Sequence, residues 1–250
     1  LIALIIVYII IGIILFFFQK SMIYFPDNQD FKNCEGFNDY EKINLNGTRF
    51  YIKENSDRAL IYYHGNAGSA CDRSFLKNTF DNYNYTLIFV EYSGYSADNK
   101  KPSYELILKD VRNIHYYLEN NSYHDNIVFG QSIGSGPASY HASLSNISKI
   151  ILVSSFSSML DLAKSKYLYY PSFFIKEKYD NIDWLKNFKG KIIIIHGEKD
   201  KEISSKLSRK LFDNLSTKSK EYVIIPNYDH NNIWFSEVIY DTIYRFINPK

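Results

Sequence analysis

Hydrophobic and polar positions along this chain alternate in short and long runs, which predicts a succession of strands and helices. From about Glu41 onward, short apolar runs are separated by longer amphipathic ones, a pattern typical of an α/β sheet. Most of the short runs are continuous Ile, Val, Leu, Phe and Tyr, so we expect strands covered on both faces. The expected strands are residues 48–53, 59–63, 86–91, 126–130, 149–153, 191–196 and 221–226.

Helices are expected between these strands because apolar residues recur there at intervals of three and four. The clearest case begins just after Pro102 and has apolar side chains at Tyr104, Ile107, Leu108, Val111, Ile114 and Leu118. Proline is common at a helix start, which supports this boundary. Similar spacing predicts helices over residues 204–215 and 233–246.

One long segment, residues 154–190, interrupts the alternation between two expected strands. A connection of this length usually has structure of its own and often forms a lid over a site. Its aromatic run at residues 167–174 fits either a lid-like insertion or a helix and loop packed as ordinary core.

The first eighteen residues carry no charge and are rich in Ile, Leu and Phe. As a helix they would span roughly 27 Å, close to the hydrocarbon thickness of a bilayer. A signal peptide is the alternative, but the sequence up to Lys20 lacks the small-residue pattern of a cleavage site. We therefore expect a single-pass transmembrane anchor at residues 1–20 and one domain at residues 21–250. The sequence does not indicate on which side of the membrane that domain lies.

Composition narrows the choice of function further. The 29 basic and 27 acidic residues give a net charge of +2, which offers no field to gather nucleic acid. The two cysteines, Cys34 and Cys71, can pair or stay free, and two cysteines fix no redox compartment.

The stretch from Gly130 to Gly136 reads Gly-Gln-Ser-Ile-Gly-Ser-Gly and follows an expected strand. A phosphate-binding loop of the Walker type needs a Lys-Ser/Thr pair after its last glycine, but Pro137 stands there. A dinucleotide fingerprint lacks its third glycine, at Ser139, and its acidic residue about twenty positions later. The remaining interpretation is G-x-S-x-G, a nucleophile elbow that presents Ser132 at a sharp strand-to-helix turn.

A serine nucleophile needs an imidazole base and a carboxylate that orients it, in the chain order Ser, Asp or Glu, His. The order and the loop positions of the six histidines favour His230, after the last expected strand. Asp200 lies just past the strand over residues 191–196, at the sheet edge where α/β proteins place their sites. Glu198, Glu202 and Asp229 are the alternative carboxylates.

Two backbone amides are expected to stabilise the oxyanion of an acyl-transfer reaction. One belongs to Ile133, directly after the candidate nucleophile. The other belongs to the loop after the strand over residues 59–63, where Asn66 stands between Gly65 and Gly68.

With these residues assembled, the chain resembles the α/β-hydrolase superfamily over nearly everything after the anchor. More narrowly, it is similar to the membrane-anchored Bem46-like group, relatives of the acyl-protein thioesterases that remove palmitate. The matching stretches are Ile23-Tyr24-Phe25-Pro26, Tyr63-His64-Gly65-Asn66-Ala67-Gly68, Glu91-Tyr92-Ser93-Gly94-Tyr95-Ser96, Gly130-Gln131-Ser132-Ile133-Gly134-Ser135, His196-Gly197-Glu198-Lys199-Asp200 and His230-Asn231. The family tends to have glycine where Ser96 stands.

This resemblance implies an α/β-hydrolase fold, with a mostly parallel eight-stranded sheet and helices on both faces. It also implies cleavage of an ester or thioester without a metal or organic cofactor. The substrates expected with the anchor are small molecules, lipids or acylated proteins. Two alternatives are a serine peptidase of the same fold, which usually has an additional domain, and a catalytically silent membrane-tethered binding module.

Overall fold

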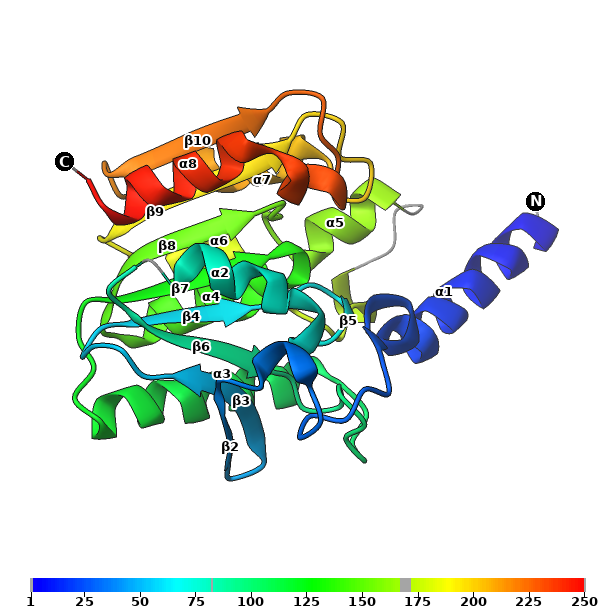
Figure 1. Ribbon diagram of the computed structural model, residues 1–250. Coiled ribbons are helices and arrows are strands. Elements are labelled where there is room, and N and C mark those ends of the chain that lie inside the picture. Colours follow the sequence, from blue (N-terminus) through cyan, green and yellow to red (C-terminus); the bar gives the residue numbers. More distant parts are fainter. Residues whose placement is uncertain (1, 82, 167–171, 250) are drawn as a thin grey trace.

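A mixed eight-stranded sheet forms the centre of the molecule (Figure 1). The computed structural model describes residues 2–81, 83–166 and 172–249. The strand order is β10-β9-β8-β7-β4-β6-β3-β2, parallel from β10 to β6, with β3 antiparallel to both of its neighbours. The strands are β2 (Glu41–Leu45), β3 (Thr48–Lys53), β4 (Ala59–Tyr63), β6 (Thr86–Glu91), β7 (Asn126–Gln131), β8 (Ile147–Val153), β9 (Lys191–Gly197) and β10 (Lys220–Ile225). The mostly parallel sheet expected from the sequence is confirmed.

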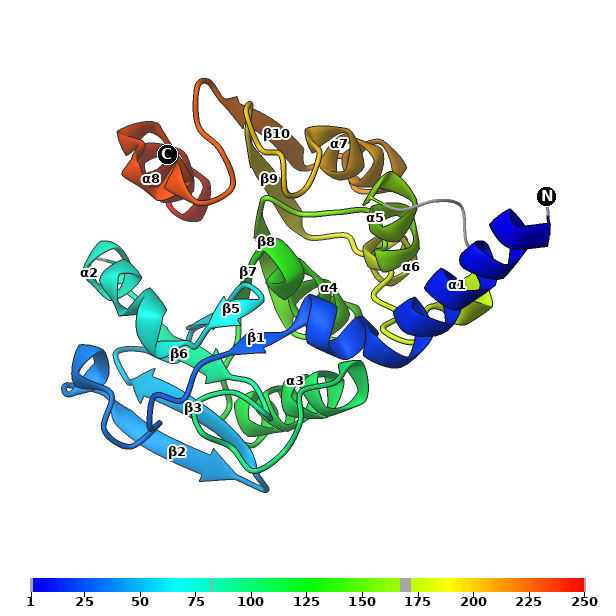
Figure 2. The same ribbon diagram turned by 90° about the vertical axis from the view of Figure 1, so that its right-hand side faces the viewer.

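Helices cover both faces of this sheet (Figure 2). One face carries α3 (Tyr104–Asn120), α4 (Ser135–Leu144), α6 (Asn181–Leu185) and α7 (Ser205–Asn214). The other carries α2 (Lys77–Phe80) and α8 (Glu237–Ile247). The shorter 3-10 turns are η1 (Glu35–Phe37), η2 (Cys71–Leu76), η3 (Ser132–Gly134) and η5 (Asn232–Phe235).

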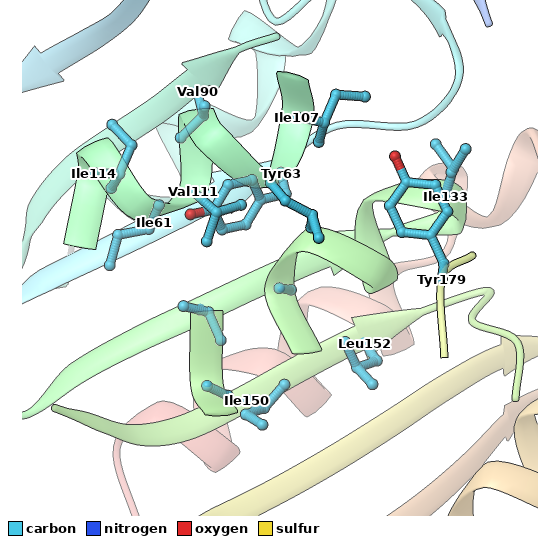
Figure 3. Close-up of a cluster of buried hydrophobic side chains, with 14 of the residues drawn as sticks. Ile61, Tyr63, Val90, Ile107, Val111, Ile114, Ile133, Ile150, Leu152 and Tyr179 are labelled. Atoms are coloured by element: carbon cyan, nitrogen blue, oxygen red, sulfur yellow. The ribbon is translucent and has the colours of Figure 1, made fainter. Parts of the chain in front are cut away.

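Each covered face has its own apolar core. Figure 3 shows part of the larger one, where Ile61 and Tyr63 of β4 and Val90 of β6 face Val111 and Ile114 of α3. These central strands are buried along their whole length, as their continuous apolar runs predicted.

The sequence analysis did not predict β2, which forms an edge hairpin with β3. Its residues are all exposed or half-buried, and its sequence Glu-Lys-Ile-Asn-Leu lacks the continuous apolar run of the central strands. The Asn46-Gly47 loop was the available signal. Both residues have positive φ, at 52° and 85°, as a two-residue type I′ hairpin turn requires.

The N-terminal helix α1 (Ile2–Ile23) projects away from the sheet (Figure 1). Among the described residues it is the one helix long and apolar enough to cross a bilayer. It runs three residues past the expected boundary at residue 20. The chain then forms β1 (Phe25–Pro26), which pairs with β5 (Ala67–Gly68) in a small separate sheet.

The segment between β8 and β9 contains α5 (Met159–Lys166), η4 (Ser172–Phe174) and α6. The aromatic run singled out at residues 167–174 falls partly on residues 167–171, which lie outside the described residues. That residues 154–190 form a lid stays a prediction.

A disulfide joins Cys34 to Cys71 and closes a sequence separation of 37 residues. Both half-cystines are buried in the second apolar core. The bond ties the segment after α1 to η2, which follows the loop that contains Asn66. The sequence left open whether these cysteines pair, because their separation along the chain gives no distance in space.

Removing this disulfide should destabilise the fold by about 4 kcal/mol, because the cross-link lowers the conformational entropy of the unfolded chain and its loss restores that entropy. We expect Cys34→Ala/Cys71→Ala to unfold at lower denaturant concentration than the wild type in the same detergent, followed by tryptophan fluorescence. Reduction of the wild type should lower its midpoint to the same extent. An unchanged midpoint after full reduction would contradict the prediction.

Asp110 on α3 is a buried carboxyl group that links three parts of the fold. Its oxygens accept hydrogen bonds from Thr48 Oγ1 at 2.6 Å, from Ser93 N at 2.7 Å and from Ser93 Oγ at 2.9 Å. Burial raises the pKa of Asp110 to about 6. The three hydrogen bonds and the positive charge of nearby Lys100 lower the pKa, but they offset the effect of burial only in part. In an unfolded chain the pKa of an aspartate side chain is about 3.9.

The folded protein therefore holds the Asp110 proton more tightly than the unfolded chain does. Its contribution to stability is fully present below about pH 4 and is lost as the pH rises through about 6. We expect the free energy of unfolding of the wild type, relative to Asp110→Asn, to fall by about 3 kcal/mol across this range. Denaturant titrations at a series of pH values measure the difference, and parallel pH profiles would contradict it.

Candidate active site

Ser132 lies at a sharp turn between β7 and α4, as the G-x-S-x-G interpretation predicted. Its backbone has a φ of 56°, in the left-handed region that non-glycine residues rarely adopt. The flanking glycines allow close packing at this turn. A Cβ at Gly130 would lie 2.4 Å from Gly134 O, and one at Gly134 would lie 2.2 Å from Tyr63 O. The turn therefore packs directly against the end of β4.

Three side chains from separate loops form a hydrogen-bonded series at the carboxyl ends of the strands. Ser132 Oγ lies 3.0 Å from His230 Nε2, and His230 Nδ1 lies 2.7 Å from Asp200 Oδ2. Since the carboxylate only accepts, His230 donates from Nδ1 and leaves Nε2 free to accept the Ser132 proton. The structure thus brings together the serine, histidine and aspartate that the sequence selected.

Asp200 is held by four hydrogen bonds in a buried position. Its Oδ1 accepts from the backbone amides of Glu202 and Ile203, at 2.9 and 2.8 Å, while Oδ2 faces His230 and His196. Burial alone would raise the pKa of this carboxyl. The hydrogen bonds from His196, His230 and Ile203 outweigh burial and hold the pKa of Asp200 well below its usual range. The carboxylate is therefore ionised at neutral pH.

His196 is a residue whose part in this arrangement the sequence analysis missed. Its buried Nε2 lies 3.2 Å from Asp200 Oδ2 and 2.9 Å from Ile203 O, so its proton is shared between the two oxygens. The available signal was its position, four residues before Asp200 at the end of β9. There it ends a strand and precedes Gly197, so it does not stand in a loop as His230 does.

The alternative carboxylates have other partners. Glu198 Oε2 accepts from Asn227 N at 2.9 Å, and Asp229 Oδ1 accepts from the amides of Asn231 and Asn232, also at 2.9 Å. Glu202 Oε2 lies 3.8 Å from Lys166 Nζ. Within residues 2–81, 83–166 and 172–249, no group of three or more His, Cys, Asp or Glu side chains is arranged to hold a metal ion.

The loop after β4 lies directly beside Ser132. An added Cβ on Gly65 would be 3.7 Å from Ser132 Cβ, and Asn66 and Ile133 both line the same cavity as Ser132. Asn66 O accepts hydrogen bonds from Phe25 N at 2.9 Å and from Tyr95 Oη at 2.8 Å. The Asn66 carbonyl is therefore fixed by both β1, which follows α1, and the loop after β6.

A largely apolar cavity of about 500 Å³ opens at Ser132 and His230, within the range of ~300–1,000 Å³ typical of small-molecule sites. Part of its lining comes from the segment between β8 and β9, through Phe156, Met159 and Ile175. Another part comes from α1, through Leu15 and Met22. The sequence analysis treated α1 only as an anchor and did not predict this contribution.

The chain is similar to several known proteins in sequence and in fold. No family model matches the chain. A protein of Acanthamoeba polyphaga mimivirus described as α/β hydrolase L404 is 28% identical over 225 residues, covering 78% of this chain and 81% of the viral protein. The human α/β hydrolase domain-containing protein 17B is 24% identical over 204 residues, and the match covers 78% of this chain and 68% of the human protein.

A solved structure from work on the metagenome-derived lipolytic enzymes LipS and LipT has the same fold. Its TM-score is 0.66 at 17% identity, and the match covers 80% of this chain and 97% of that one. The resemblance predicted from the short motifs is thus confirmed by both the relatives and the fold. The chain is thus similar to α/β hydrolases in sequence and shares their fold.

Proposed function

We propose that this protein is a membrane-anchored serine hydrolase that cleaves an ester or thioester through Ser132, His230 and Asp200. The observation that carries the proposal is the continuous hydrogen-bonded series from Ser132 Oγ through His230 to Asp200, opening on an apolar cavity. In this series the serine has a base within reach, and the base has an oriented tautomer.

In the proposed reaction, Ser132 Oγ attacks the acyl carbon while His230 Nε2 takes its proton. The resulting oxyanion accepts hydrogen bonds from the backbone amides of Ile133 and Asn66. His230 then protonates the leaving alcohol or thiol as the carbonyl re-forms. A water molecule, deprotonated by His230, attacks the acyl-enzyme, and the acid leaves as Ser132 recovers its proton.

The apolar cavity supports an acyl group as the part of the substrate that is bound. Most of its lining residues are Leu, Ile, Met, Phe or Ala, and the polar ones besides Ser132 and His230 are Gln19, Asn66, Lys164, Lys166, Glu202 and Asn231. The apolar helix α1 supports attachment to a membrane. Together they favour a lipid or acylated substrate over a small polar ester.

The nucleophile is tested by labelling with a fluorophosphonate probe, which reacts with activated serines. We expect the wild type to be labelled, Ser132→Ala to lose labelling, and ester hydrolysis by that variant to fall by a factor on the order of 10⁴–10⁶. Ser143→Ala, at an exposed serine on α4, is the matched control and should keep both. A folded wild type without Ser132-dependent labelling would instead favour the silent binding module.

The orienting carboxylate is tested by Asp200→Asn. An amide cannot fix the Nδ1–H tautomer of His230 as a carboxylate does, so we expect kcat to fall by a factor of about 10³–10⁴. Asp229→Asn is the matched control, since Asp229 binds backbone amides of its own turn. Initial rates with a water-soluble ester measure both variants. Equal losses in the two would argue against the role given to Asp200.

A further inference from the structure

The C-terminal part of α1 lines the same cavity as Ser132 and His230. Four residues of this helix are among those that line the cavity: Leu15, Gln19, Met22 and Ile23. The preceding residues of α1, from Ile2 to Ile14, are almost all exposed and apolar. One continuous helix therefore passes from an exposed apolar surface into the wall of the cavity.

Gln19 is the polar residue of α1 within this wall, and its amide is fully engaged. Its Nε2 donates to Phe16 O at 3.0 Å and to Phe174 O at 3.2 Å. Its Oε1 accepts from Lys176 N at 2.7 Å and from Glu177 N at 3.3 Å. Three of these four partners are main-chain groups of the segment between β8 and β9, more than 150 positions away in the sequence.

The segment that Gln19 binds also lines the cavity, through Phe174 and Ile175. Figure 2 shows this segment, before α6, beside the C-terminal end of α1. Lys176 Nζ lies 3.6 Å from the centre of the Phe16 ring, and the Phe16 and Phe174 rings meet edge to face at 6.1 Å. These contacts hold the helix and the segment together one turn before Gln19.

A second attachment follows one turn later along the chain. Tyr24 Oη donates to the buried carboxylate of Glu177 and lies 2.9 Å from Tyr179 Oη. Glu177 also accepts from Tyr104 N at 2.7 Å. The helix end is thus tied to the catalytic domain by buried polar contacts, which specify one position rather than a sliding apolar contact.

We propose that α1 is part of the acyl-binding site as well as the anchor, and that Gln19 is the residue that positions it. This rests on the proposed function, because it concerns how an acyl group reaches Ser132. The wall formed by Leu15 and Met22 determines which acyl chains fit, and Gln19 fixes that wall relative to Phe174 and Ile175. An acyl chain that leaves a bilayer along α1 then enters the cavity without crossing water, so long-chain substrates are favoured.

The test compares acyl-chain preference in the full-length protein reconstituted in nanodiscs. The substrates are p-nitrophenyl acetate, octanoate and palmitate, and kcat and KM are measured for each. Met22→Trp adds bulk to the wall, and Gln19→Leu removes the four hydrogen bonds while keeping the size and apolar character of the helix. Phe18→Leu is the matched control, since Phe18 is on the same helix, 59% exposed and outside the cavity lining.

We expect the ratio of kcat/KM for palmitate to that for acetate to fall about tenfold or more in Met22→Trp, the size of effect that a few methylene groups have in an apolar pocket. Gln19→Leu should lower the same ratio, mainly through a higher KM for palmitate. Phe18→Leu should keep the wild-type ratio. Fluorophosphonate labelling of Ser132 reports whether the triad is intact in each variant.

The outcomes separate this inference from the proposed function. Wild-type protein that hydrolyses esters, with an unchanged ratio in Met22→Trp and Gln19→Leu, would overturn the inference alone. An equal loss for all three esters would also overturn it, because it would assign these residues a purely structural role. Wild-type protein that neither hydrolyses any ester nor reacts with the probe would overturn the proposed function and the inference with it.

Discussion

The close approach of two backbone segments is the constraint on which the rest of the site depends. The turn at Ser132 packs against the carbonyl groups at the end of β4 with no side chain between them, since a Cβ at Gly134 would collide with Tyr63 O and His64 O. This contact sets the distance between Ser132 and the loop of Gly65 and Asn66. The energetic cost of the left-handed backbone at Ser132, roughly 1–3 kcal/mol, is borne by the surrounding buried strands.

Much of the fold could be predicted because buried parallel strands need continuous apolar runs. The runs over the buried parallel strands β4 and β6 have the predicted bounds, residue for residue. The edge strand β2 was not predicted, because its residues are partly or fully exposed and its composition resembles that of a loop. The triad residues could be selected from chain order, since each follows a strand whose carboxyl end meets the same sheet edge.

What the sequence could not show is which polar side chains at the strand ends point toward one another. His196 reads as a strand end, and only the fold brings its Nε2 to within 3.2 Å of Asp200. Ser96, where the family tends to have glycine, adopts a φ of 45° and donates its Oγ–H to the buried Glu91 at 2.7 Å. A local hydrogen bond thus stabilises a backbone conformation that glycine would adopt without one.

The pairing of β1 with β5 joins the N-terminal helix to the sheet domain. Phe25 N donates to Asn66 O, so the strand that follows the helix is bonded to the loop beside Ser132. A cut at residue 20, which treats the helix as a detachable module, would remove Leu15 and Gln19 from the cavity lining and leave it open on that side. A fragment without the helix therefore has a different cavity, and any ligand preference measured on it would describe the fragment rather than the parent chain.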